Sequence, residues 1–297
     1  MTFRALLHSL WRRTGARRLA LLGLLAAIPG CAPVALLNRT VDQDGLAVRR
    51  GIAYGPLPRQ AMDVWRPAEA AADLPVVVFF YGGSWQSGSR GDYPFVAADL
   101  ARRGHVVVVP DYRLHPEASY PAFLEDAAAA VAAARRRAVE WGGNPRRLVL
   151  MGHSAGAHIA AMLALDPRWL SAAGDSRDGV AGLVGLAGPY DFLPITGRDI
   201  RAVFAPAADL RQTQPITFAD RAAPPALLLH GGDDTTVLPR NSRALAARIN
   251  DSGGRAELRI YDGVGHIGIV LGFARAFRGW SPALEDSVGF IAALPSR

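Results

Sequence analysis

The stretch Gly152-His153-Ser154-Ala155-Gly156 follows an apolar run, residues 148–151, and precedes an alanine- and leucine-rich segment that ends near residue 165. The run predicts a strand, and the later segment predicts a helix. A Gly-x-Ser-x-Gly pentapeptide between them makes a turn so tight that small residues must flank the serine. The turn raises the Ser154 hydroxyl above the sheet at a helix N-terminus, where negative charge is stabilised. Ser154 is therefore a candidate nucleophile.

Two later segments supply candidate partners, because a serine hydroxyl needs a base within hydrogen-bond reach. Strand 226–230 runs into a glycine-rich turn with Asp233 and Asp234, and strand 256–261 runs into a loop that ends in His266. The ends of parallel strands lie on one edge of a sheet, so the three side chains can meet there. We expect His266 to take the serine proton and Asp234 to orient the imidazole. Asp234 is preferred to Asp233, the alternative, because it fits the spacing His-Gly-x-x-Asp-x-x-Val.

Each of these residues also has a simpler explanation. Serine often caps helices, aspartates are common in turns, and His266 is one of seven histidines. Their order along the chain, each just past a strand, favours the catalytic interpretation. We assign no catalytic role to the three other histidines near these segments, which are His153, His158 and His230.

A glycine pair after strand 75–80 predicts an oxyanion-binding loop. The segment reads Tyr81-Gly82-Gly83-Ser84-Trp85. Glycines there let backbone N–H groups point at a developing oxyanion. We expect the N–H groups of Gly83 and Ser84 to act with that of Ala155, the residue after the nucleophile, while Gly82 shapes the turn. An ordinary glycine turn is the alternative.

With these motifs, the chain from about residue 52 onward resembles the α/β-hydrolases of the hormone-sensitive-lipase-like and carboxylesterase group. That group has His-Gly-Gly-Gly or His-Gly-Gly-x-Trp where this chain has Tyr81 to Trp85. Its Asp-Tyr-Arg-Leu-x-Pro-Glu segment is present as residues 111–117, which we interpret as structural bracing. The resemblance implies a serine hydrolase that cleaves small to medium carboxylic esters through an acyl-enzyme. The alternatives are an arylformamidase or amidase of the same fold, since Gly-Gly-x-Trp occurs there too, and an inactive hydrolase-fold binding protein.

Strands and helices alternate along the chain, which predicts an α/β fold. We expect a mostly parallel, doubly wound sheet with helices on both faces. The expected strands are 48–54, 62–66, 75–80, 105–109, 147–151, 180–187, 226–230 and 256–261, and the expected helices are 93–103, 121–139, 155–165, 239–251 and 283–293. Residues 188–224 break the rhythm where this fold usually inserts a lid. We expect a small lid insertion there, with a surface excursion as the alternative.

The N-terminus has the pattern of an export signal. Five arginines precede a short apolar run, residues 19–28, and small residues follow. Cys31, the only cysteine, then resembles the lipidated cysteine of a bacterial lipobox. We expect a signal peptide at 1–30, a tether at 31–46 and the hydrolase domain at 47–297. The enzyme would then be exported and lipid-anchored on the periplasmic side of the cell envelope. An uncleaved anchor, a plain buried cysteine and a twin-arginine signal are the alternatives.

Charge and composition narrow the partners. The chain has 297 residues, consistent with one large α/β domain, and a net charge of +7. Five of these charges lie in the N-terminal arginines, so nothing suggests a nucleic-acid partner. Histidines and carboxylates lack the spacing of a metal site, and no phosphate-binding loop occurs. We therefore expect no metal and no cofactor, a small-molecule ester as substrate, and no particular oligomeric state.

Overall fold

The computed structural model describes residues 37–38, 41–69 and 72–295. The expected signal peptide and Cys31 lie outside these residues, as does half of the expected tether. Asp42–Arg297 forms one compact unit by its internal contacts. None of the helices in the described part of the chain combines the length and hydropathy required of a membrane-spanning segment.

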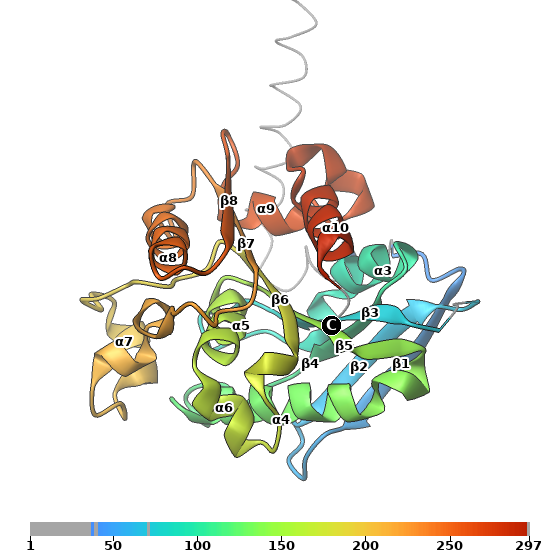
Figure 1. Cartoon of the computed structure of the whole chain (residues 1–297), viewed down its shortest axis with the longest axis horizontal. Coiled ribbons are helices and arrows are strands. Elements are labelled where there is room, and N and C mark those ends of the chain that lie inside the picture. Colours follow the sequence, from blue (N-terminus) through green and yellow to red (C-terminus); the bar gives the residue numbers. More distant parts are fainter. Residues whose placement is uncertain (1–36, 39–40, 70–71, 296–297) are drawn as a thin grey trace, which may run out of the picture. The chain divides into compact units, whose positions relative to one another are not determined.

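Eight strands form one sheet with the spatial order β1-β2-β4-β3-β5-β6-β7-β8 (Figure 1). From β4 to β8 all neighbours are parallel, whereas β2 is antiparallel to both β1 and β4. The bounds are β1 Leu46–Ala53, β2 Ala61–Pro67, β3 Leu74–Phe80, β4 Val106–Pro110, β5 Gly143–His153, β6 Val180–Leu186, β7 Ala226–Gly231 and β8 Ala256–Tyr261. The predicted mostly parallel sheet is confirmed.

The inner strands are apolar on both faces because helices cover both faces. Every residue of β4 and of β6 is buried. Short valine-rich runs favour strands, since branched side chains pack well on a pleated surface. A parallel sheet covered on both sides therefore produces continuous apolar runs rather than alternation.

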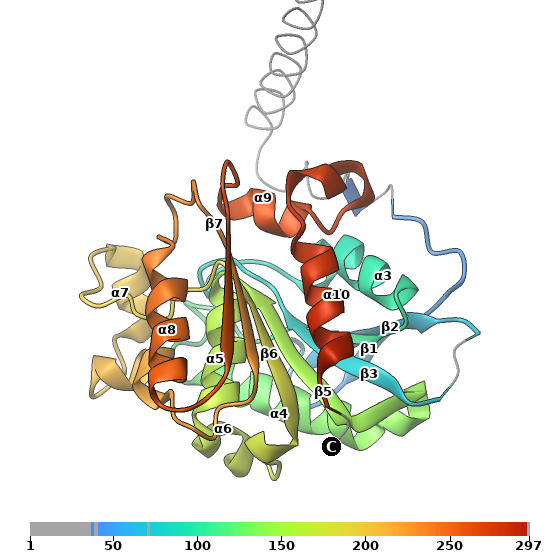
Figure 2. The same ribbon diagram turned by 45° about the horizontal axis from the view of Figure 1, so that its top comes forward.

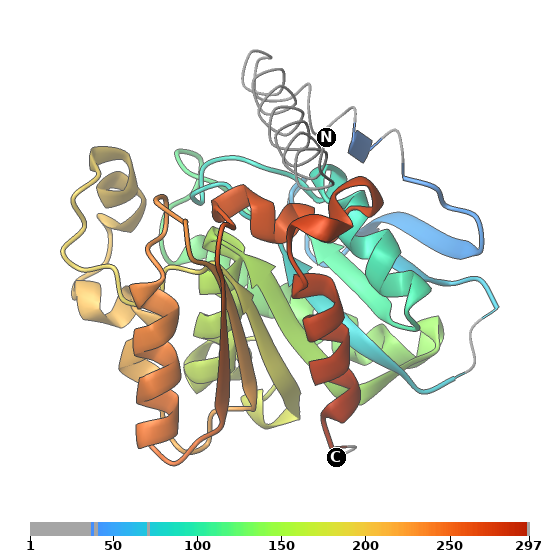
Figure 3. The ribbon, with the colours of Figure 1, turned by 90° about the horizontal axis from the view of Figure 1, so that it is seen from above.

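Two groups of helices cover the sheet. A Cβ on Gly182 of β6 would meet Phe290 and Leu294 at the end of α10 (Ala283–Ala293), whereas one on Gly152 of β5 would meet the start of α5 (Ala155–Leu165). These helices thus lie on opposite faces (Figures 2 and 3). Helix α3 (Pro94–Arg102) lies on the same face as α10, and an ion pair between Arg103 and Glu285 joins them. Helices α4 (Ala122–Arg137) and α6 (Pro167–Ala172) contact α5 on the other face. The remaining long helix, α8 (Arg240–Asp251), packs on β7 and β8.

The order of the strands reverses around β3, which has β4 on one side and β5 on the other. In the parallel pair β3–β5, Phe80 lies opposite Gly152. The segments that follow these two strands, which carry Gly83 and Ser154, are therefore neighbours at one edge of the sheet. In open α/β sheets ligands bind at such a reversal, outside the carboxyl ends of the strands.

Short helices are the main departure from the predicted elements. We expected a loop ending in His266, but this residue begins α9 (His266–Leu271). The segment contains Gly268 and three β-branched residues, which disfavour helix, so it carries no helical signal in the sequence. Residues 188–224 contain α7 (Arg198–Phe204) and two 3-10 helices, Leu210–Thr213 and Pro215–Phe218.

Candidate active site

Ser154 lies in a strained turn between β5 and α5. Its φ of +55° is in the left-handed region, which residues other than glycine rarely adopt. The two flanking glycines are required by close contacts. A Cβ on Gly152 would lie 2.3 Å from the backbone of Gly156, and a Cβ on Gly156 would lie 2.0 Å from the carbonyl oxygen of Phe80. These close backbone contacts fix the strained turn, and Ser154 is partly exposed.

A continuous chain of hydrogen bonds joins the three residues selected from the sequence. The Nε2 atom of His266 lies 2.9 Å from Oγ of Ser154, and its Nδ1 atom lies 2.7 Å from Oδ2 of Asp234. Since a carboxylate only accepts, Nδ1 carries the proton and Nε2 is free to accept the serine proton. Asp233 is exposed and takes no part in this chain, so the structure brings in Asp234 and not its neighbour.

The Asp234 carboxylate is buried and fully engaged. Its Oδ1 atom accepts the backbone N–H groups of Thr236 and Val237, each at 2.9 Å. Its Oδ2 atom also lies 3.2 Å from Nε2 of His230. Burial acts to raise the pKa of Asp234, but the hydrogen bonds from His230, His266 and Val237 outweigh it and hold this pKa well below its usual value. The carboxylate is therefore ionised beside the imidazole.

The loop after β3 packs directly on the turn that holds Ser154. A Cβ on Gly82 would lie 3.1 Å from the Ser154 Cβ. Gly83, with φ of +131°, turns so sharply that a Cβ would lie 2.1 Å from the Ser87 carbonyl oxygen. That the N–H groups of Gly83 and Ser84 face the oxyanion stays a prediction.

Side chains far apart in sequence brace this loop. The Tyr81 hydroxyl donates to Oδ1 of Asp111 at 2.9 Å and accepts from Nη2 of Arg59 at 2.8 Å. The Tyr112 hydroxyl donates to the Tyr81 carbonyl at 2.8 Å. Arg90 adds an ion pair to Asp111. Tyr81 therefore stands in the place of the histidine of related motifs with its own set of partners, two of which belong to the segment 111–117.

Two histidines without an assigned role contact the site. His153 is buried, and its Nε2 atom lies 3.0 Å from the carbonyl oxygen of His266. Burial, followed by the nearby His266, lowers the pKa of His153 to about 3, so its ring is neutral at neutral pH. His230 contacts Asp234 from behind. Sequence reasoning missed both contacts, although the His-Gly-x-x-Asp spacing was a signal for the second.

The insertion at 188–224 packs beside the nucleophile helix. His158 lies one turn after Ser154 in α5. Its Nε2 atom is 2.8 Å from the carbonyl oxygen of Thr213, which belongs to the insertion. The Trp85 ring lies edge-on to His158, with centroids 5.1 Å apart, and to Phe204, at 4.9 Å. These aromatic contacts make the insertion a wall next to the site. Whether it moves as a lid stays a prediction.

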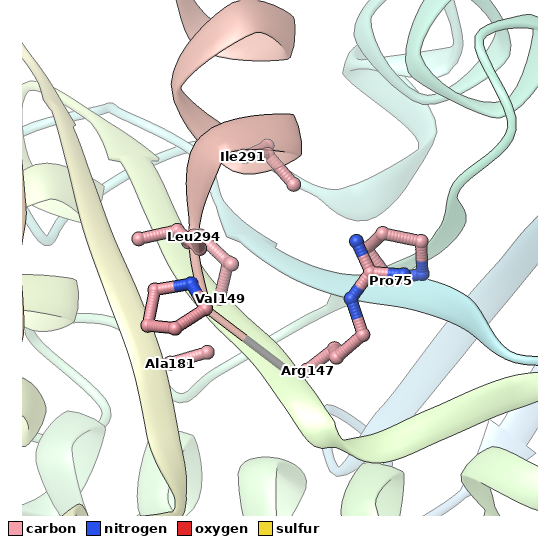
Figure 4. Close-up of a pocket in the computed structure, with 7 residues that line it drawn as sticks. Pro75, Arg147, Val149, Ala181, Ile291 and Leu294 are labelled. Carbon is pink, nitrogen blue, oxygen red and sulfur yellow. The ribbon is translucent and has the colours of Figure 1, made fainter. Parts of the chain in front are cut away.

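A slight hollow lies elsewhere, between α10, the starts of β3 and β6 and the middle of β5 (Figure 4). Its lining includes Pro75, Val149, Ala181 and Leu294. Ser154, Asp234 and His266 are not among the residues that line it. Within the described ranges, His, Cys, Asp and Glu side chains form no group of three that could hold a metal ion.

Comparisons with known proteins point to esterases. The sequence matches the family described as BD-FAE over residues 62–249. It is 30% identical over 264 residues to isoprenylcysteine alpha-carbonyl methylesterase of Arabidopsis thaliana, covering 81% of this chain and 61% of that protein. It is 32% identical over 220 residues to esterase LipC of Mycobacterium tuberculosis, covering 68% and 55%. The chain thus spans between half and two thirds of these relatives.

Solved structures share the fold. A truncated carbohydrate esterase from gut microbiota superposes with a TM-score of 0.74 at 20% identity, over 84% of this chain and 97% of that one. Butyrate-bound esterase 2 of Thermogutta terrifontis gives 0.69 at 23% identity, over 86% and 96%. At such identities the likeness concerns the arrangement of the elements and not the substrate.

Proposed function

This chain belongs to the BD-FAE family and has the α/β-hydrolase fold, and we propose that it is a serine esterase that cleaves carboxylic esters of small to medium size. The observation that carries the proposal is the unbroken chain from Asp234 through His266 to Ser154. Names of relatives add support, since they are esterases and a methylesterase, and a structural neighbour holds butyrate. The segment 111–117 further favours the hormone-sensitive-lipase-like group within this fold.

In the proposed reaction, Oγ of Ser154 attacks the ester carbonyl carbon while Nε2 of His266 takes its proton. Negative charge develops on the carbonyl oxygen, where the N–H groups of Gly83, Ser84 and Ala155 stabilise it. The imidazolium then protonates the leaving alcohol, and Ser154 is left acylated. Water, deprotonated by His266, attacks the acyl-enzyme and releases the acid. Asp234 stays ionised throughout and stabilises the imidazolium.

The experiment is Ser154→Ala, assayed with nitrophenyl butyrate and matched to Ser171→Ala on exposed helix α6. We expect the first variant to lose activity with an unchanged melting temperature and the second to retain both. Full activity in Ser154→Ala would overturn the mechanism. A wild-type protein that neither turns over esters nor reacts with a fluorophosphonate would be a binding protein of this fold. Faster hydrolysis of aryl formamides than of esters would favour the arylformamidase or amidase alternative.

We also propose that residues 1–30 direct export, that Cys31 carries lipid, and that residues 31–46 tether the hydrolase domain, 47–297, to the periplasmic side of the cell envelope. The support is the basic start, the short apolar run and the position of the cysteine. Labelling cells with a fatty acid tests the proposal. We expect label in the wild-type protein and none in Cys31→Ser, and equal labelling would contradict it.

A further inference from the structure

His230 is a fully buried histidine that the proposed reaction does not use. It is the penultimate residue of β7, and its ring lies behind Asp234. The Nε2 atom is 2.7 Å from the carbonyl oxygen of Val237 and 3.2 Å from Oδ2 of Asp234. The Nδ1 atom is 2.7 Å from Oγ of Ser242 in α8. Every polar atom of this side chain thus has a partner.

The partners determine which nitrogen carries the proton. Nε2 faces a carbonyl oxygen and a carboxylate oxygen, both of which only accept, so Nε2 must be the donor. In the neutral ring Nδ1 then accepts the hydroxyl proton of Ser242. The hydrogen bonds therefore run from Ser242 to His230 and from His230 to the Val237 carbonyl oxygen, and Oδ2 of Asp234 is the second, more distant acceptor that the same N–H faces.

Two imidazole nitrogens therefore lie against one oxygen of Asp234. Nδ1 of His266 donates to Oδ2 at 2.7 Å, and Nε2 of His230, whose N–H is shared with the Val237 carbonyl oxygen, lies 3.2 Å from the same atom. Oδ1 is held by the two backbone N–H groups of Thr236 and Val237. Three hydrogen bonds and the nearby N–H of His230 fix the rotation of the carboxylate. The donor from His230 also draws negative charge away from the oxygen that faces His266.

We propose that His230 is a positioning residue of this site, which holds Oδ2 of Asp234 toward His266 and limits how strongly that oxygen favours the imidazolium. His230 thereby acts on Asp234 and, through Asp234, on the proton transfer at His266. The expected effect of His230 on kcat and on kcat/KM rests on the proposed esterase function. Other titratable groups near His266 are His153, whose ring is tilted against it with centroids 4.9 Å apart, and the exposed carboxylates of Asp233 and Asp262 on the adjoining loops.

Two substitutions separate the donor from the ring. The amide nitrogen of glutamine can take the place of Nε2, whereas asparagine reaches only as far as Nδ1. His230→Asn therefore removes the donor to Asp234, and His230→Gln keeps one. His105→Gln is the matched control, because His105 is also buried but its Nδ1 lies 2.9 Å from the Leu100 carbonyl oxygen, before β4.

The measurement is the NMR titration of His266 without substrate, followed by the pH profile of kcat/KM. In His230→Asn we expect the midpoint of both to rise by about half a pH unit and kcat to fall about fivefold, the effect of one lost hydrogen bond. His230→Gln should restore most of the shift, and His105→Gln should not move it. If His230→Asn does not fold, Ser242→Ala should give a smaller shift in the same direction.

Unchanged midpoints in the folded His230→Asn protein, or equal shifts in the asparagine and glutamine variants, would overturn the proposal and leave His230 a packing residue. The proposed function is tested separately by turnover in the wild-type protein. Absent ester turnover together with the expected NMR shifts would refute the esterase function and keep the role of His230.

Discussion

Replacing Asp234 with asparagine tests the candidate site most directly, because the structure determines how the new amide must lie. Oδ1 accepts two backbone N–H groups at 2.9 Å, from Thr236 and Val237. If the amide nitrogen took that place, both bonds would be lost. If it takes the place of Oδ2, both backbone bonds are kept, the 3.2 Å contact from His230 is lost, and the 2.7 Å bond with Nδ1 of His266 must reverse. The second orientation is therefore favoured, and the NH2 group faces Nδ1 of His266.

That orientation inverts the imidazole. Nδ1 of His266 must accept from the amide, so the proton moves to Nε2, the atom that lies 2.9 Å from Oγ of Ser154. A nitrogen that already carries a proton cannot take one from serine. We expect kcat to fall about 10⁴-fold, or about 5.4 kcal/mol in activation free energy, because the base is present in the wrong tautomer.

The assay is hydrolysis of nitrophenyl butyrate at neutral pH, together with a thermal melt to show that the variant folds. Asp233→Asn is the matched control, because it makes the same change one residue earlier on an exposed side chain. We expect this control to stay within about twofold of the wild type. Activity of Asp234→Asn within tenfold of the wild type, or an equal loss in Asp233→Asn, would refute the reasoning.

Three further predictions concern the supports of the site. Gly156→Ala places a Cβ 2.0 Å from the Phe80 carbonyl oxygen and should lower the free energy of unfolding, measured by urea titration, by about 2–3 kcal/mol. Gly289→Ala is the control, because there is open space around Gly289, and it should cause no such loss. Equal free energies of unfolding in the two variants would contradict this prediction. Tyr81→Phe leaves Asp111 and Arg59 without a shared partner and should lower the free energy of unfolding by about 1–3 kcal/mol. In the same variant kcat should fall more than KM changes. A variant with unaltered stability and unaltered kcat would show that the loop needs no such brace. Burial lowers the pKa of His158 to about 4, so between pH 6.5 and 4 the unfolded chain binds more protons than the folded one. The free energy of unfolding should therefore fall on acidification by about 1.4 kcal/mol per pH unit because of this residue. In His158→Phe this free energy should depend less steeply on pH, and a slope identical to that of the wild type would argue against the neutral buried ring.

The strands and the mostly parallel character of their sheet were predictable from the sequence, because runs such as Val106–Val109 have few other stable environments. Branched apolar side chains on both faces require a sheet covered by helices on both sides. The glycine spacing around Ser154 was equally informative, since it follows from backbone contacts within a few residues. The helix at His266 was not predictable, because its glycine and β-branched residues have weak helical propensity and the helix forms only through tertiary packing.

By itself, the sequence determined which residue types could act and in which order they follow the strands. The sequence preferred Asp234 to Asp233 by its spacing, and the tertiary structure placed its carboxylate against His266. Tertiary structure alone placed Tyr81 between Arg59 and Asp111 and brought His153 and His230 against the candidate base and acid. The physical reason is that a hydrogen bond depends on distance and direction between atoms. Loops that are far apart in the chain acquire those distances only when the sheet brings the ends of its strands to one edge.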